Sequence, residues 1–200
     1  MGYLHTNEVP SGELCIWSQS VLTGYFKNEE KTNEVLQNGW LQSGDIVTVA
    51  PNGAITIVDR IKNIFKLSQG EYIAPEKLEN VYVQSEDIQQ IWVHGDSFKD
   101  YAVAFVVVDS DRVSKFAMDK EYGMSREDLL NDKDLIREVQ DSIKMLAKEN
   151  KFNNIEIPRK IKLLKDPFTV EKGLLTPTMK LKRNIAVDKF KDEIEALYQK

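Results

Sequence analysis

The sequence has one cysteine, two histidines and no long apolar run among its 200 residues. A single cysteine, Cys15, cannot form an intrachain disulfide, which excludes disulfide-stapled secreted folds. His5 and His94 stand too far apart in the sequence for zinc-ligand spacing. The longest apolar run, Tyr101 to Val108, has strand length and falls short of the ~20 residues that a membrane-spanning helix needs. With no secretory signal in the first ten residues, we expect an intracellular protein without a metal site of its own.

Charge is divided unevenly along the chain. Residues 1–150 carry 15 basic and 25 acidic side chains, whereas residues 151–200 carry 12 basic and 7 acidic ones. A basic tail favours a phosphate-bearing ligand, an anionic lipid or a nucleic acid. Because no surface aromatics alternate with its lysines, and no helix-turn-helix, RNA-binding sheet or finger pattern surrounds them, we expect no nucleic-acid partner.

Apolar patterning predicts a mixed α/β (α+β) fold in two parts. The first part is rich in short strands and tight turns, with a strand over Gly12–Ser18, a helical turn over Lys31–Leu36, and a hairpin of Trp40–Val49 and Ala54–Val58. The second part is predicted to contain helices over Pro75–Gln84 and between Asp132 and Asn150, strands over Ile88–Val93, Tyr101–Val108 and Ile161–Leu164, and a terminal helix with Val187, Phe190, Ile194 and Leu197 on one face. Residues 101–108 show no polar alternation, so we expect a strand buried on both faces.

The first candidate site is the sequence from Gly39 to Asp45, GWLQSGD. Gly44 places Asp45 at the expected start of a strand, where a carboxylate can accept both hydroxyls of a ribose, as acidic residues at strand ends do in dinucleotide sites. An ordinary turn is the alternative that these residues alone leave open.

The second candidate site is the charged segment that begins with Asp59, Arg60 and Lys62 and continues to Glu79. It lies at the boundary of the two parts, and a polar connector can change φ and ψ without losing core contacts. Gly70 permits a turn or the close approach of a ligand. The alternative is a plain turn followed by a helix cap.

The third candidate site is the basic sequence LLTPTMKLKR, from Leu174 to Arg183, within a long loop rich in proline and glycine. A lysine on its long stem can stabilise negative charge that develops on a carboxylate and a phosphate during acyl transfer. A solvated surface charge is the alternative interpretation.

Together and in this order, the three clusters resemble the carboxyl-terminal portion of the long-chain fatty acyl-CoA synthetases, in the superfamily of adenylate-forming (AMP-binding) enzymes. The resemblance covers nearly the whole chain. It is carried by LLTPTMKLKR and by WLQSGDIVTVAPNGAITIVDRIKNIFKLSQGEYIAPEKLE. It implies a small mobile C-terminal domain with a short sheet flanked by helices at 64–200, a hinge at 60–63, and at 1–59 the β-rich end of a large AMP-binding domain.

The resemblance also implies roles for single residues. Asp45 would bind the ribose hydroxyls of ATP, Arg60 would reach the same ribose or a phosphate, and Lys62 would be the hinge. Lys180 would be the catalytic lysine of adenylation. After a domain rotation, a loop would border CoA and the adenylate through Ser68, Gly70, Glu71 and Tyr72.

The implied reaction converts ATP, a long-chain fatty acid and CoA into acyl-CoA, AMP and diphosphate. The superfamily's phosphate loop and its adenine-binding segment are absent from this sequence. We therefore expect an inactive part of a longer ligase, whose missing N-terminal domain binds Mg²⁺. The resemblance allows membrane association of the full-length enzyme on the cytoplasmic face of the endoplasmic reticulum or another organelle. Two alternatives stay open: a stand-alone nucleotide- or CoA-binding or regulatory module, and a ligase for another carboxylic acid.

Overall fold

The computed structural model describes residues 2–119 and 125–199. The chain divides into two compact units, Met1–Ile64 and Phe65–Lys200. They are called unit 1 and unit 2, and each is described by itself.

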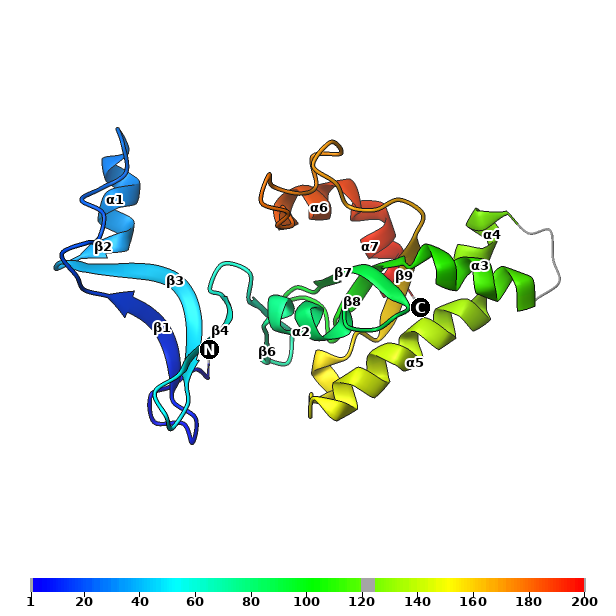
Figure 1. Cartoon of the computed structure of the whole chain (residues 1–200), viewed down its shortest axis with the longest axis horizontal. Helices are drawn as coiled ribbons and strands as arrows, with labels where there is room; N and C mark the ends of the chain where they lie inside the picture. Colours follow the sequence, from blue (N-terminus) through cyan, green and yellow to red (C-terminus); the bar gives the residue numbers. More distant parts are fainter. Residues whose placement is uncertain (1, 120–124, 200) are drawn as a thin grey trace. The chain divides into compact units, whose positions relative to one another are not determined.

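Unit 1 is an antiparallel sheet in which the long strand β3 pairs with each of the other three strands (Figure 1). Its elements are β1 (Ser11–Ile16), α1 (Glu29–Val35), β2 (Leu36–Gln37), β3 (Trp40–Val49) and β4 (Ile55–Arg60). Asn38 and Gly39 both have positive φ and form the two-residue turn between β2 and β3. The predicted hairpin around residues 50–53 is confirmed as β3 and β4, with Gly53 at φ +82° in its turn.

Unit 2 is a three-stranded sheet, in the order β7-β8-β9, with helices on both faces. Its elements are β5 (Phe65–Lys66), β6 (Tyr72–Ile73), α2 (Pro75–Tyr82), β7 (Ile88–His94), β8 (Val103–Val108), α3 (Ser110–Asp119), α4 (Arg126–Leu130), α5 (Lys133–Glu149), a 3₁₀ turn (Asn154–Glu156), β9 (Lys160–Leu164), α6 (Arg183–Lys189) and α7 (Lys191–Tyr198). The central strand β8 runs antiparallel to β7 and parallel to β9. The mixed fold class predicted from the sequence is confirmed.

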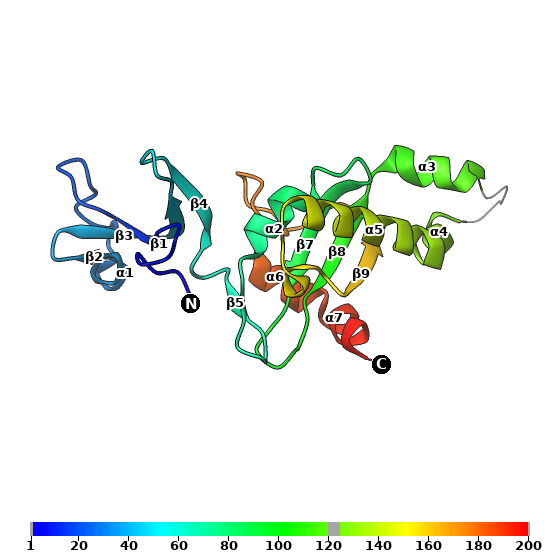
Figure 2. The ribbon, with the colours of Figure 1, turned by 90° about the horizontal axis from the view of Figure 1, so that it is seen from below.

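The central strand explains the layering of unit 2. All six residues of β8 are buried, as the absence of polar alternation predicted. Ala104, Val106 and Val108 belong to the core shared with α2 and α5, whereas the alternate residues Val103, Phe105 and Val107 belong to the core shared with α6 and α7. Figure 2 shows these two helix pairs on opposite faces of the sheet.

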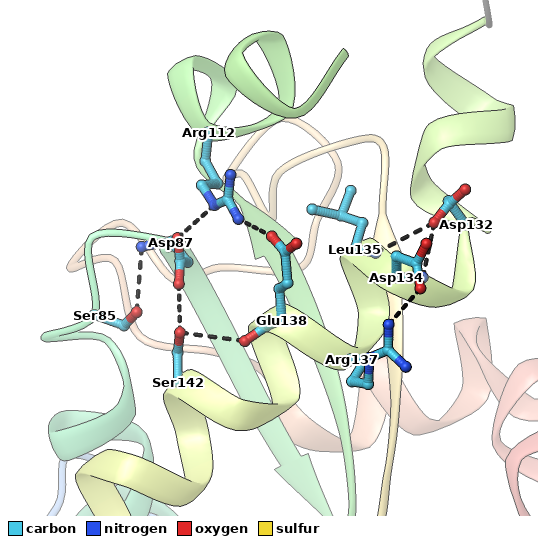
Figure 3. Close-up of polar contacts among 9 residues, drawn as sticks. All are labelled: Ser85, Asp87, Arg112, Asp132, Asp134, Leu135, Arg137, Glu138 and Ser142. Carbon is cyan, nitrogen blue, oxygen red and sulfur yellow. Dashed lines mark hydrogen bonds and ion pairs between the residues drawn. The ribbon is translucent and has the colours of Figure 1, made fainter. Parts of the chain in front are cut away.

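Helix α5 forms because its sequence supplies both a cap and an apolar stripe. Asp132 accepts hydrogen bonds from the backbone amides of Asp134 and Leu135, which satisfies donors that the first turn would leave unpaired (Figure 3). The buried residues then recur every four positions and face the sheet: Leu135, Val139, Ile143 and Ala147. Each such side chain contributes about 1.5 to 3 kcal/mol when it is fully buried, Ala147 less.

A polar cluster fastens α3 and α5 to the start of β7 (Figure 3). The Arg112 guanidinium lies 2.8 Å from an oxygen of Asp87 and also pairs with Glu138. The Ser142 hydroxyl donates to the other oxygen of Asp87 at 2.5 Å. Helix α3 is therefore held by charge pairing as well as by its apolar side chains.

Two features of unit 2 differ from the sequence-based expectation. The terminal helix is interrupted at Phe190, which ends α6 and precedes α7. Its ring packs against Trp92, Phe105 and Phe168, so that the chain bends where the aromatic cluster forms. Helices α3 and α4 were not predicted.

Among the described residues, no helix is long and apolar enough to cross a lipid bilayer.

Candidate functional site

Lys180 lies on a tight loop, Leu174–Lys182, called here the lysine loop. The base of this loop is closed by a bridge between Leu175 and Leu181. The Thr176 amide donates to the Lys180 carbonyl at 2.8 Å, and the Lys180 amide donates to the Thr176 hydroxyl at 3.0 Å. Leu174 and Leu175 are buried in the core against α6 and α7, whereas Lys180 is exposed. The loop thus exposes the side chain of Lys180 to solvent from a fixed base.

An ion pair on the C-terminal side of the lysine loop joins it to α2. The Arg183 guanidinium donates to both carboxylate oxygens of Glu79, at 2.9 and 2.6 Å. Glu79 also accepts a hydrogen bond from the Val93 amide at 2.8 Å. The sequence analysis missed this pair, because the two residues are 104 positions apart and no local pattern links them.

His94, at the end of β7, lies in the electrostatic environment of the same arginine. Burial lowers the pKa of His94 below its ordinary value of 6.5. Asp96 acts in the opposite direction, and the positive charge of Arg183 lowers this pKa further. His94 is therefore favoured in its neutral form beside Arg183.

A hollow of about 420 Å³ borders the lysine loop. It is lined by α2, β7 and the loop itself, with Asn80, Gln90, Met179 and Lys180 among its walls. The Lys180 ammonium therefore adjoins a space that could hold a small ligand.

The segment from Ser68 to Tyr72, called here the glycine loop, joins β5 to β6. Gly70 has φ +96°, a conformation that L side chains rarely adopt. Its amide donates to the Leu67 carbonyl at 2.9 Å, and the Ser68 amide donates to the Lys99 carbonyl at 2.9 Å. Glu71 and Tyr72 are exposed. The four predicted residues Ser68, Gly70, Glu71 and Tyr72 therefore form one exposed turn, fixed by backbone hydrogen bonds.

The glycine loop and the lysine loop are not brought together. They lie at different edges of unit 2, and both views show them apart (Figures 1 and 2). Helix α2 follows the glycine loop directly and carries Glu79, the partner of Arg183. One rigid unit therefore presents two different loops in two different directions.

Asp45 and Arg60 of unit 1 do come together. They face each other across β3 and β4, with the Arg60 Nε atom 3.1 Å from an oxygen of Asp45, whose side chain is 19% exposed. Asp45 lies within β3 and not at the start of a strand, which corrects the sequence-based expectation. Gly44 has φ +72° at a break in the pairing of β1 with β3, so the strand bulges there and continues.

The predicted hinge residue Lys62 lies in a turn just before the boundary between the units. The amides of Asn63 and Ile64 both donate to the Arg60 carbonyl. Asp59, which begins the predicted connector but was given no role of its own, is fully buried and accepts hydrogen bonds from the Arg60 amide at 2.6 Å and from the Asn63 side chain. The Lys62 side chain is exposed, with its ammonium 3.2 Å from Glu34. Hydrogen bonds to the Asp59 carboxylate hold the residues around this turn in place, whereas the Lys62 side chain makes a surface contact with Glu34.

A sequence model of the AMP-binding enzyme C-terminal domain matches residues 62–200. The chain belongs to this family. The match confirms the resemblance to the carboxyl-terminal portion of adenylate-forming enzymes.

Relatives with assigned names make the family resemblance more specific. Long chain acyl-CoA synthetase 1 of Arabidopsis thaliana is 40% identical over all 200 residues, and long-chain-fatty-acid–CoA ligase 6 of Rattus norvegicus is 44% identical over 94% of the chain. The chain spans 30% and 27% of the lengths of these two relatives. A solved adenylation domain of carboxylic acid reductase from Segniliparus rugosus, in complex with AMP and a carboxylic acid, has a TM-score of 0.86 at 34% identity, covering 98% of this chain and 30% of that one.

In this AMP-binding enzyme C-terminal domain, the lysine loop presents the exposed side chain of Lys180 and the glycine loop presents a backbone turn. Across residues 2–119 and 125–199, no group of three or more His, Cys, Asp or Glu side chains is arranged to hold a metal ion. The cation can neutralise an anionic ligand, and the backbone turn can lie close to a slender one.

Proposed function

We propose that the chain is the C-terminal part of an ATP-dependent long-chain fatty acid–CoA ligase. The observation that carries this proposal is the lysine loop, because it presents Lys180 from a buried base beside a hollow. The identity of 40 to 44% with long-chain acyl-CoA synthetases supports the class of acid and the CoA acceptor. In this proposal residues 1–59 end the large domain, residues 60–63 are the hinge and residues 64–200 form the mobile domain.

In the first half-reaction, an oxygen of the fatty acid carboxylate attacks the α-phosphorus of ATP. The bond from that phosphorus to the bridging oxygen breaks, diphosphate leaves, and the acyl-adenylate forms. Lys180 lies between carboxylate and phosphate, neutralising the repulsion of two anions and holding them in line. Asp45 accepts hydrogen bonds from the ribose hydroxyls, and Arg60 contacts the same ribose or a phosphate.

Mg²⁺ would neutralise part of the phosphate charge of ATP. We assign it to the N-terminal part of the ligase. The residues of this chain contribute the lysine and the ribose contacts instead.

In the second half-reaction, the CoA thiol gives up its proton to solvent, and its sulfur attacks the acyl carbonyl carbon of the adenylate. The bond to the phosphate oxygen breaks, AMP leaves, and the thioester forms. The glycine loop borders the thiol arm here, because a turn with no side chain at Gly70 lets a slender ligand pass close to the backbone. A change of φ and ψ at Lys62 exchanges the two loops at the site.

The second candidate function is adenylation of another carboxylic acid, followed by transfer of the acyl group to an acceptor other than CoA. It is favoured by the identity of 34 to 35% with adenylation domains of carboxylic acid reductases. Adenylation by Lys180 would be the same in both candidates. The higher identity with CoA ligases makes a long-chain acid and CoA the first choice.

The test is product analysis with a complete ligase that contains this chain, supplied with palmitate, ATP and CoA. We expect acyl-CoA, AMP and diphosphate in equal amounts. Asp45→Asn should raise the KM for ATP about 10- to 100-fold, because a charge-assisted hydrogen bond to the ribose contributes about 1.5 to 3 kcal/mol. Glu30→Gln on the exposed first turn of α1 is the matched control. Formation of ADP and phosphate would refute the adenylate route, and transfer only to another thiol would favour the second candidate.

A further inference from the structure

The Glu79–Arg183 ion pair differs from the surface ion pairs of the same unit. Its two side chains are only 15% and 16% exposed, and two hydrogen bonds join them. The pair of Lys172 and Asp166, in the loop that leads to the lysine loop, is 34% and 71% exposed. A bidentate arginine–carboxylate pair fixes both distance and angle, which a single lysine contact does not.

The surroundings of Glu79 make the pair a junction of three elements. Glu79 belongs to α2, it accepts a hydrogen bond from the Val93 amide of β7, and its arginine partner opens α6. Arg183 follows Lys180 by three residues. The C-terminal arm of the lysine loop is therefore attached to the sheet and to α2 at one point.

The N-terminus of α6 lacks a side-chain cap. Its N-cap residue Lys182 makes no side-chain capping hydrogen bond, although its backbone amide donates to the Leu174 carbonyl at 2.8 Å. Nothing in this cap would compensate for the loss of Arg183. The position of Lys180 is thus set by the buried base of the loop, by the loop's own hydrogen bonds and, on its C-terminal side, by this ion pair.

We propose that Glu79 and Arg183 form a clamp that positions Lys180 for adenylation, which makes both of them positioning residues. This inference rests on the proposed function of Lys180. A mostly desolvated ion pair gives little net stability compared with apolar residues, whereas breaking it leaves an uncompensated charge. The ion pair therefore contributes mainly by fixing the position of the lysine loop. A displacement of about 1 Å of a reacting group can lower the rate about 100-fold.

Hydrogen exchange on the 200-residue chain tests the structural half of this inference. In Arg183→Gln, the amides of Thr176, Lys180 and Lys182 should exchange at least about 10-fold faster, because their loop loses the ion pair that anchors its C-terminal side. The amides of Leu67 and Gly70 in and beside the glycine loop should not change. Lys172→Gln is the matched control, since it breaks a neighbouring exposed pair. Unchanged exchange in the lysine loop, or an equal rise throughout unit 2, would overturn the clamp.

Single-turnover kinetics with the complete ligase test the functional half. Arg183→Gln should slow adenylate formation about 100-fold while thioester formation from supplied acyl-adenylate stays within about twofold. Arg183→Lys keeps the charge but loses the bidentate geometry, so an intermediate loss of about 10-fold is expected. If Arg183→Gln fails to fold, the lysine variant decides.

Lys180→Ala separates failure of the clamp from failure of the proposed function. If Lys180→Ala abolishes adenylation and neither Arg183 variant slows it, the clamp is wrong and the proposed function stands. If Lys180→Ala leaves adenylation unchanged, the proposed function fails, and the clamp fails with it.

Discussion

The two loops of unit 2 are built by different means. The glycine loop is shaped by its backbone, through the positive φ of Gly70 and the hydrogen bonds of Gly70 to Leu67 and of Ser68 to Lys99. The lysine loop is shaped by side chains as well, through the Thr176 hydroxyl and the Glu79–Arg183 clamp. One loop therefore presents main chain to a ligand, and the other presents a charge.

This difference suits two different chemical steps. A slender thiol arm needs a wall without bulky side chains, whereas two repelling anions need a cation between them. The loops lie at different edges of unit 2 (Figures 1 and 2), so the proposed function requires two orientations of that unit, one for each step. On the proposed function, changes in each loop should affect one half-reaction and spare the other.

A large effect on the second half-reaction is expected from Gly70→Val in the complete ligase. A β-branched residue at φ +96° costs about 1 to 3 kcal/mol and forces the loop to move. Thioester formation from supplied acyl-adenylate should fall about 100-fold, with adenylate formation nearly unchanged. The control is Gly53→Val in the turn of unit 1, where φ is +82° and the backbone penalty is similar. Equal losses in both half-reactions would contradict the assignment of each loop to one half-reaction.

A moderate effect is expected from Lys62→Pro. Proline fixes φ near −65° and restricts the preceding residue, so the connector should lose the freedom to exchange the loops. Steady-state turnover should fall about 10-fold, while each half-reaction measured alone is retained in part. Lys62→Ala removes only the exposed contact with Glu34, worth less than about 1 kcal/mol, and should turn over normally. Normal turnover in the proline variant would argue against a hinge at this residue.

The smallest effect is expected when the pH is lowered. Protonation of His94 should reduce the free energy of unfolding and affect the lysine loop more than the glycine loop. The pKa of His94 is lower in the folded chain than its ordinary value of 6.5. Below about pH 6.5 the unfolded chain therefore binds more protons, and the free energy of unfolding should fall as the pH falls. Protonation also adds a positive charge near Arg183, so the lysine loop should lose hydrogen-exchange protection before the glycine loop does.

Denaturant unfolding at pH 7 and pH 5 checks this prediction. His94→Gln should remove the part of the pH dependence that arises from this side chain. An identical pH dependence in both proteins would show that other groups are responsible.

Regular local patterns made much of the fold predictable. The hairpin of β3 and β4 was predicted from its turn residues, β8 from its unbroken apolar run, and α5 from its four-residue apolar repeat. The division of the terminal helix at Phe190 depends on aromatic partners distant in the sequence, which a periodic pattern does not show. Charge-rich α3 is held by Arg112, whose partners Asp87 and Glu138 are likewise remote.

The candidate site was predictable only in part for the same reason. Resemblance located Asp45, Arg60 and Lys180, and the structure pairs the first two. The Glu79–Arg183 clamp joins residues 104 positions apart, so neither composition nor spacing pointed to it. Asp45 lies inside a strand because pairing with β2 extends β3 back to Trp40, and Gly44 makes a bulge within the strand instead of a turn before it.

The most direct test of the account is a pair of single-turnover assays on Lys180→Ala in the complete ligase. One follows acyl-adenylate formation from palmitate and ATP, and the other follows CoA transfer from supplied acyl-adenylate. The account predicts a loss of about 100- to 1,000-fold in the first assay, as for removal of one group that stabilises transition-state charge, and a rate within about twofold of wild type in the second. Equal losses in both assays, or no loss in the first, would contradict it.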